Sequence, residues 1–291
     1  MTDDHTSTNR LRKTLEWRGR TVAWDRFGAG PPLVFLHGTP WSSALWQPIA
    51  EALSRRFTVY LWDMPGYGAS SMDPAHAVDL GAQSELFAHL LKEWGLARPQ
   101  VIAHDFGGAV ALRARLLHGA RYAALCLVDA VAVSPWGSPF FTLVQKHAEV
   151  FTQLPPAVHR DAVEAYIRGA SFQGLSDAQL EMLVAPWATP AGQTAFYRQI
   201  AAADERFTDE IEPLYERIDE PTHIVWGAED TWIPQDRATH LQGLIPQATL
   251  ALIPAAGHLI QLDAPEALTA EITHWAEGQH SRALPPLSET P

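Results

Sequence analysis

The chain has 291 residues, 47% of them hydrophobic, and a formal net charge of −12 at pH 7. This length and hydrophobic content allow one large domain with a sizeable core. The acidic balance, with no basic stretch to offset it, argues against nucleic acid and anionic membrane surfaces as partners. The single cysteine, Cys126, excludes an internal disulfide. We see no secretory signal pattern and no apolar run of about 18 residues, roughly the shortest that spans a bilayer, and therefore expect a cytoplasmic protein.

The first half of the chain alternates between strand-like and helix-like segments. Residues 1–14 are polar, and we expect them to be flexible. The predicted strands are 15–24, 33–35, 57–61 and 100–103, and the predicted helices are 46–55, 78–94 and 108–117. Such alternation is typical of an α/β fold, in which helices flank a mostly parallel central sheet and ligands bind at the carboxyl ends of the strands.

The alternation is interrupted in the second half. Strands are predicted at 124–128, 222–227 and 249–253, but the long segment between the first two has helical patterns at 140–151, 156–168, 177–184 and 190–204. We therefore expect a core formed by 15–133 and 216–278, an inserted, mainly helical cap formed by 134–215, and a flexible tail formed by 279–291. A cap at this place would roof the carboxyl ends of the strands and exclude water.

Residues 101–110 read Val-Ile-Ala-His-Asp-Phe-Gly-Gly-Ala-Val, an apolar strand followed by a glycine turn and a helix. This pattern predicts a nucleophile elbow, the sharp turn that presents a reactive side chain above a sheet. Serine usually occupies the position of Asp105. A carboxylate is ionised without the help of a base, since its ordinary pKa is about 3.9. By displacing a leaving group from a saturated carbon, it forms an ester that water can cleave, whereas serine would form an ether. Asp105 therefore favours hydrolytic displacement at saturated carbon over its simpler alternative role as a helix cap.

Two further residues complete a candidate catalytic triad. Asp230 and His258 each follow a predicted strand, so the chain order is nucleophile, acid, histidine. We expect Asp230 to orient His258, and His258 to activate water against the Asp105 ester.

A glycine loop after the strand at 33–35 is expected to form an oxyanion hole. The loop reads His37-Gly38-Thr39-Pro40, and an N–H near Thr39 would act together with the N–H of Phe106, the residue after the nucleophile. Losing one such donor typically costs roughly 2.7–4 kcal/mol of barrier. We expect His37 to brace this loop beside the substrate pocket.

In this order, the motifs resemble the aspartate-nucleophile branch of the α/β-hydrolase superfamily, which contains epoxide hydrolases and haloalkane or haloacetate dehalogenases. The similarity runs from about residue 15 to about residue 275 and includes the glycine loop, the turn Asp63-Met64-Pro65-Gly66-Tyr67-Gly68-Ala69-Ser70, the elbow, Asp230 and His258. Ala103 replaces the usual first glycine of the elbow, and Phe106 replaces a tryptophan that is common after the nucleophile. The resemblance implies an α/β-hydrolase fold with a helical cap and with no metal or organic cofactor. It also makes Asp129 a rival of Asp230 as the triad acid, because some relatives place the acid after the strand that corresponds to 124–128.

The resemblance also suggests how the leaving group is assisted. Tyr197, in Ala195-Phe196-Tyr197-Arg198, is similar to the cap tyrosine of epoxide hydrolases and is expected to donate a proton to the departing alkoxide. A second cap tyrosine has no obvious counterpart, although Tyr166 and Tyr215 are candidates. The other residues expected in the substrate pocket are Trp41, Trp136, Phe140, His147, Trp187 and Leu259.

The hydrogen-bond donors available to the leaving group distinguish between the possible substrates, an epoxide and a haloalkane. Phe106 and Thr39 replace the halide-binding tryptophan and asparagine of haloalkane dehalogenases, which favours an epoxide hydrolase that produces a vicinal diol. Residues 42–46, in contrast, resemble haloalkane dehalogenases, and one of the three pocket tryptophans could supply an indole N–H. We therefore predict an epoxide hydrolase that acts, as a monomer or homodimer, on a small, neutral, mainly apolar substrate. The alternatives are a haloalkane dehalogenase-type enzyme and a non-catalytic ligand receptor of the same fold. An ordinary esterase is disfavoured, because acyl transfer through a carboxylate would form an anhydride.

Overall fold

The structure, a computed structural model, describes residues 11–283, with side chains described up to residue 279. Most of the two segments expected to be flexible, 1–14 and 279–291, lies outside these residues. Where they are described, they differ from the prediction. Strand β1 (Lys13–Trp17) begins inside the first segment, where it pairs with the next strand, and helix α11 (Pro265–Ala283) continues into the second. The helix continues because residues 279–283 contain no glycine or proline to end it.

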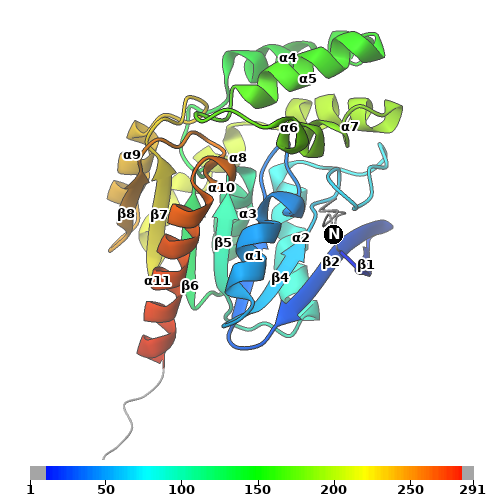
Figure 1. Ribbon diagram of the computed structural model, residues 1–291. Coiled ribbons are helices and arrows are strands. Elements are labelled where there is room, and N and C mark those ends of the chain that lie inside the picture. The colour runs from blue at the N-terminus through cyan, green and yellow to red at the C-terminus, as the bar shows by residue number, and fades with distance from the viewer. Residues whose placement is uncertain (1–10, 284–291) are drawn as a thin grey trace, which may run out of the picture.

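Within the described residues, eight strands form one sheet in the order β1-β2-β4-β3-β5-β6-β7-β8 (Figure 1). β2 pairs antiparallel with both β1 and β4, and the other neighbours run parallel. The predicted strand 15–24 is a hairpin, because Arg18 and Gly19 have φ values of 50° and 76° and reverse the chain. The remaining strand bounds are β2 Arg20–Gly28, β3 Pro32–Leu36, β4 Thr58–Trp62, β5 Gln100–His104, β6 Ala124–Val128, β7 Thr222–Gly227 and β8 Thr249–Ile253.

Helices cover both faces of the sheet, which confirms the predicted α/β fold. Alternate residues of a strand point to opposite faces, so a central strand must be apolar throughout. In β3, Val34 and Leu36 pack in the core that contains α2 and α3, whereas Leu33 and Phe35 pack in the core that contains α1 and α11. The bounds of these and the shorter elements are η1 Ser43–Trp46, α1 Gln47–Leu53, α2 Leu80–Glu93, α3 Phe106–Leu117, α9 Asp236–Leu244 and α10 Ile260–Asp263.

The segment between β6 and β7 contains the helices that the sequence predicts, and α4 to α7 lie together at one end of the sheet (Figure 1). Three of these helices begin at capping side chains: Ser138, Ser176 and Thr189 each accept a hydrogen bond from a backbone N–H in the first turn. The bounds are α4 Pro139–Phe151, α5 Pro156–Arg168, α6 Asp177–Val184, α7 Pro190–Ala201, α8 Arg206–Asp209 and η2 Glu212–Arg217. In the described part of the chain, no helix has the length and apolarity needed to cross a membrane.

The sheet order brings the candidate triad together. Strands β5, β6 and β7 are neighbours, and Asp105, Asp129 and Asp230 follow their carboxyl ends. His258 follows β8, the next strand in the sheet. Residues that are far apart in the sequence therefore meet at one edge of the sheet.

Candidate active site

Asp105 lies at a sharp turn between β5 and α3. Its φ and ψ are 52° and −122°, a combination that residues other than glycine rarely adopt. The loop after β3 passes so close to this turn that a Cβ on Gly38 would lie 2.3 Å from both Cβ and Oδ1 of Asp105. The carboxylate makes no capping hydrogen bond to α3. The turn therefore has the geometry of an elbow, and the side chain does not act as a helix cap.

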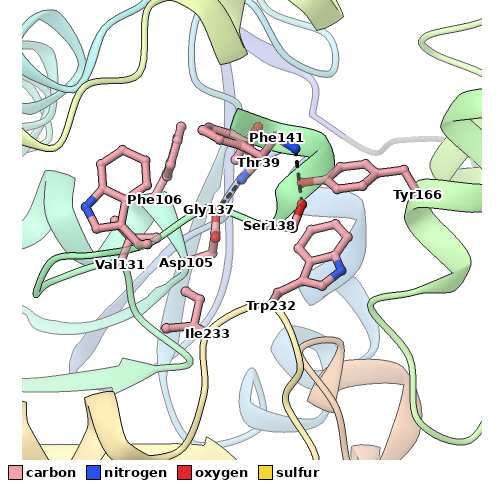
Figure 2. A pocket seen from close by; sticks show the side chains of 11 residues that line it. Thr39, Asp105, Phe106, Val131, Gly137, Ser138, Phe141, Tyr166, Trp232 and Ile233 are labelled. Carbon is pink, nitrogen blue, oxygen red and sulfur yellow. Dashed lines mark hydrogen bonds between the residues drawn. The ribbon is translucent and has the colours of Figure 1, made fainter. Parts of the chain in front are cut away.

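Both oxygens of the Asp105 carboxylate face polar groups. The backbone N–H of Thr39 donates to Oδ1 at 2.7 Å (Figure 2), and Oδ2 lies 3.3 Å from Nε2 of His258. Burial alone would raise the pKa of Asp105. The proximity and charge of His258, helped by the backbone N–H of Phe106, instead hold this pKa below its ordinary value. Asp105 is thus ionised, and the two expected oxyanion donors both reach it.

His258 lies between two carboxylates. Its Nδ1 is 2.8 Å from Oδ2 of Asp230, and its Nε2 faces Asp105 without a well-aligned hydrogen bond. The other oxygen of Asp230 accepts hydrogen bonds from the backbone N–H groups of Trp232 (2.7 Å) and Ile233 (3.0 Å), which fix the carboxylate. Burial opposes protonation of His258, but Asp230 and Asp105 together raise its pKa well above the ordinary value. The structure thus brings the three expected triad residues together.

Asp129, the rival acid, is buried beside this group. Its Oδ1 accepts a hydrogen bond from the backbone N–H of Gly227 at 2.8 Å. Burial, and then the nearby charge of Asp230, raise the pKa of Asp129 well above its ordinary value. A protonated carboxyl group cannot stabilise an imidazolium as a carboxylate does. The geometry and charges therefore favour Asp230 over Asp129 as the partner of His258.

A cavity borders the Asp105 carboxylate (Figure 2). Its wall is formed by Thr39, Asp105, Phe106, Val131, Trp136, Gly137, Ser138, Phe141, Tyr166, Trp232 and Ile233. Among the expected pocket residues outside the triad and the oxyanion hole, Trp136 lines this cavity. Within the described residues, no group of three or more His, Cys, Asp or Glu side chains is arranged to hold a metal ion.

The other six expected pocket residues, including Trp41 and Trp187, are not part of the cavity wall. His37 braces the glycine loop, because its two ring nitrogens hydrogen-bond to backbone groups of that loop and of the turn after β4. Phe140 packs against Tyr166, His147 is exposed on α4, and Leu259 is buried in the core. Phe140 and His147 lie on the predicted helix, but the sequence does not fix how that helix is rotated about its axis.

Tyr166, and not Tyr197, reaches the cavity. The hydroxyl of Tyr197 is 2.8 Å from Nδ1 of His159, and Tyr197 is not part of the cavity wall. Tyr166 lines the cavity, and Figure 2 shows its hydroxyl end pointing toward Ser138. Burial, and then the charge of Asp105, raise the pKa of Tyr166, so the phenol keeps its proton. Tyr197, the expected leaving-group donor, thus lies away from the cavity beside Asp105, whereas Tyr166 lines it.

Residues 33–272, which include Thr39, Asp105, Asp230 and His258, match the alpha/beta hydrolase family. The chain belongs to this family. A crystal structure of an alpha/beta hydrolase fold protein from Burkholderia ambifaria is 47% identical, with a TM-score of 0.88 and coverage of 91% of this chain and 97% of that chain.

Two curated members of the family act on different substrates. A pimeloyl-[acyl-carrier protein] methyl ester esterase from Nitrosomonas europaea is 29% identical over 255 residues, which cover 82% of this chain and 93% of that protein. Haloalkane dehalogenase 2 from Mycobacterium tuberculosis is 26% identical over 273 residues, which cover 88% of this chain and 91% of that protein. The chain is therefore an α/β-fold hydrolase, and its substrate must be argued from the site.

In this alpha/beta hydrolase, the indole N–H groups that could bind a leaving halide point elsewhere. Trp136 donates to a threonine hydroxyl at 2.9 Å, and Trp187 donates to the Pro40 carbonyl at 3.0 Å. The N–H of Trp41 has no hydrogen-bond partner among the described residues, but Trp41 is not part of the cavity wall. Figure 2 shows the indole nitrogen of Trp232 on the side away from Asp105. The cavity thus offers hydroxyl groups rather than indole N–H groups.

Two residues beside the Asp105–His258 pair were not among those predicted from the sequence. Trp232 lines the cavity and stacks on Tyr166 and on His258, with centroid separations of 4.2 Å and 5.2 Å. His104 lies against His258, with its Nε2 3.0 Å from the His258 carbonyl oxygen. Burial, and then the charge of His258, lower the pKa of His104 to about 3, so its ring stays neutral. The available signal was their position in the chain, close to the acid and directly before the nucleophile.

Proposed function

We propose that this α/β hydrolase opens epoxides through an alkyl ester of Asp105, which water activated by His258 then cleaves to a vicinal diol. The observation that carries the proposal is the placement of the Asp105 carboxylate. Its Oδ1 accepts from Thr39, its Oδ2 faces His258 at 3.3 Å, and Tyr166 lines the adjoining cavity. The nucleophile, an oxyanion donor and a proton donor thus border one cavity, and the base lies against the nucleophile.

In the first step, Oδ2 of Asp105 attacks a ring carbon of the epoxide. A bond forms between this carbon and Oδ2 as the ring C–O bond breaks, and the ring oxygen takes the proton of the Tyr166 hydroxyl. Assistance of this kind typically contributes about 10²–10⁴-fold. The raised pKa of Tyr166 keeps the proton in place until the alkoxide forms.

Formation of the ester prepares His258 to act as a base. The nearby charge of Asp105 contributes to the raised pKa of His258, and the ester removes that charge. The pKa of His258 therefore falls, and the imidazolium returns a proton to the Tyr166 phenolate. His258 is then neutral at the moment when water must be deprotonated.

In the second step, His258 takes a proton from water, and the hydroxide attacks the carbonyl carbon of the Asp105 ester. Negative charge collects on Oδ1, where the N–H groups of Thr39 and Phe106 stabilise it. The intermediate expels the alkoxide of the diol, which takes the proton of His258. The proton left on the Asp105 carboxyl group passes to His258 and restores the starting state.

We propose that residues 134–215 act as a cap over this reaction. Several residues of the cavity wall, including Trp136, Phe141 and Tyr166, come from this segment, and the remainder come from the core. An apolar wall suits a small, neutral substrate and keeps bulk water away from the ester.

The experiment is the intact mass of the His258→Gln variant after incubation with an aryl epoxide. Glutamine cannot deprotonate water, so the ester should accumulate and add the mass of the whole epoxide. The double variant with Asp105→Ala should gain no mass. An adduct that persists in the double variant, or full turnover by Asp105→Ala, would overturn Asp105 as the nucleophile.

A haloalkane dehalogenase is the second candidate, because the similarity to Haloalkane dehalogenase 2 covers most of this chain and the buried Trp41 has an unpartnered N–H. The same His258→Gln variant incubated with a 1-bromoalkane distinguishes the two. An added alkyl group with release of bromide would assign the site to halide displacement. No adduct with either compound would favour a ligand receptor. Release of nitrophenol from a nitrophenyl ester, abolished by Asp105→Ala, would favour an esterase.

A further inference from the structure

Thr39 makes hydrogen bonds to different parts of the chain through its backbone and through its side chain. Its backbone N–H donates to Oδ1 of Asp105 at 2.7 Å, whereas its side-chain hydroxyl donates to Oε1 of Gln199, in α7, at 2.9 Å. Both Thr39 and Gln199 are buried, at 4% and 1% exposure. The Nε2 of Gln199 has no hydrogen-bond partner among the described residues. The bond to Thr39 is therefore the polar contact that fixes the orientation of this amide.

A second contact links the same loop to the helical segment between β6 and β7. The indole N–H of Trp187 donates to the carbonyl of Pro40 at 3.0 Å. The backbone carbonyl of Trp187 is 2.9 Å from Nε2 of His159, whose Nδ1 is 2.8 Å from the Tyr197 hydroxyl. Neutral His159 fits both contacts if Nε2 donates and Nδ1 accepts. Tyr197 thus belongs to a network that ends at the oxyanion loop.

We propose that Gln199 is a positioning residue, which aligns the Thr39 N–H with Asp105 Oδ1 and so makes helix α7 part of the oxyanion site. This inference rests on the proposed function, since it concerns cleavage of the Asp105 ester. It assigns to the helical segment a role in the chemical step, in addition to enclosing the substrate.

The effect of Gln199 should fall mainly on hydrolysis of the ester. In the free carboxylate the negative charge is shared between two oxygens, and in the ester Oδ1 is a neutral carbonyl oxygen. The full charge of the tetrahedral intermediate collects on Oδ1, where the Thr39 N–H points. Misalignment of this N–H therefore slows ester cleavage more than ester formation.

The matched pair of variants is Gln199→Met and Gln193→Met. Both residues are buried glutamines of α7, but the amide of Gln193 donates to the carbonyls of Thr152 and Leu154, within the helical segment. Methionine keeps most of the side-chain volume and removes the amide. We expect the ester of Gln199→Met, once substrate is removed, to decay about 10-fold more slowly than that of the wild type, with kcat/KM changed less than about twofold. We expect the ester of Gln193→Met to decay at the wild-type rate.

A double-mutant cycle with Thr39→Val separates the hydrogen bond from packing. Valine removes the hydroxyl of Thr39 and keeps its backbone N–H. Because both substitutions break the same bond, the double variant should be no slower than the slower single variant. Three results would overturn the inference. The effects of Gln199→Met and Thr39→Val on the rate of ester decay could multiply in the double variant. Gln199→Met and Gln193→Met could slow ester decay equally, or the ester of Gln199→Met could decay at the wild-type rate.

A readout that needs no substrate keeps the inference distinct from the proposed function. Hydrogen exchange at the Thr39 amide should be faster in Gln199→Met than in the wild type, and unchanged in Gln193→Met. If His258→Gln forms no adduct, the proposed function fails and the exchange result decides the positioning role by itself. If His258→Gln does form the adduct while exchange and ester decay are unchanged in Gln199→Met, only the positioning role fails.

Discussion

The rings of Tyr166 and Trp232 stack with their centroids 4.2 Å apart and their planes at 17°. Trp232 also stacks on His258, and its backbone N–H holds the Asp230 carboxylate at 2.7 Å. The proposed proton donor of the first step and the histidine–aspartate pair of the second step therefore share one aromatic wall. A change in the position of Trp232 would disturb both steps at once.

Tyr166→Phe is expected to lower kcat/KM for epoxide opening by about 10²-fold, because the departing alkoxide loses its proton donor. Turnover of a 1-bromoalkane, if present, should not change, since a halide leaves without a proton. The assay is diol formation under initial-rate conditions. Tyr197→Phe is the matched control, because it removes a hydroxyl that hydrogen-bonds to His159 outside the cavity. A larger loss in Tyr197→Phe than in Tyr166→Phe would reverse the assignment of the donor.

Asp230→Asn is expected to slow decay of the ester by at least about 10²-fold, because a neutral amide neither stabilises the imidazolium nor fixes the tautomer of His258. The ester of Asp129→Asn should decay at a rate within about twofold of the wild-type rate, since the raised pKa of Asp129 keeps its carboxyl group neutral. Pulse-labelled ester followed by mass spectrometry gives both rates. The opposite ranking of the two variants would make Asp129 the acid of the triad.

Asp129→Asn is also expected to stabilise the protein in a pH-dependent way. The raised pKa of Asp129 means that the folded protein must take up a proton that the unfolded chain releases above its ordinary pKa of 3.8. This cost is absent below that pKa and grows as the pH rises toward the folded value. The variant should therefore raise the melting temperature more at about pH 8 than at about pH 4. An equal change at both pH values would show that Asp129 does not titrate abnormally.

The two chemical steps should respond differently to pH. The lowered pKa of Asp105 keeps the nucleophile ionised, so kcat/KM should not decline until the pH falls below the ordinary aspartate value of 3.8. Decay of the ester needs neutral His258 and should fall as the pH is lowered through the pKa of His258 in the ester. We expect that pKa to lie below the one that NMR measures for His258 in the free enzyme, because the ester has lost the charge of Asp105. A higher value in the ester would contradict the proposed coupling.

Gly38→Ala is expected to abolish ester formation while leaving the fold intact. The new Cβ would lie 2.3 Å from Cβ and Oδ1 of Asp105, so the carboxylate must leave the Thr39 N–H. Gly243→Ala is the control, because a Cβ there meets nothing within 4 Å. Alanine within α9 should retain activity and slightly raise the melting temperature. Intact mass and thermal unfolding report the two outcomes.

The sequence predicts most of the fold because its signals are local. Residues 177–184 match α6 at both ends, since Ser176 caps the first turn and the apolar spacing of the segment is helical. β6 is recognisable because it is apolar on both faces. The hairpin at Arg18 and Gly19 was missed because this dipeptide is not one of the usual turn signals.

The positions of site residues are predictable from the sequence where the order of the strands fixes them. The prediction fails where the packing of helices determines which side chains reach the site. Asp105, Asp230 and His258 follow neighbouring strands, so their meeting requires only the sheet topology. Tyr166 and Tyr197 lie on different helices of one segment, and their roles depend on how α5 and α7 pack over the sheet. That packing involves contacts between residues far apart in the sequence, which local patterns do not encode.

The helical segment leaves the sheet after β6 and returns at β7, two strands that are paired side by side. The segment is therefore an insertion between two adjacent strands. Replacing it with the corresponding segment of another protein would leave the order of the strands in the sheet unchanged. Such chimaeras would carry a new cavity wall over an unchanged Asp105, Asp230 and His258. If Gln199 has the role inferred here, a productive replacement segment must also bring a hydrogen-bond acceptor for the Thr39 hydroxyl. Compatibility at this one contact would then restrict which segments can be combined with this core.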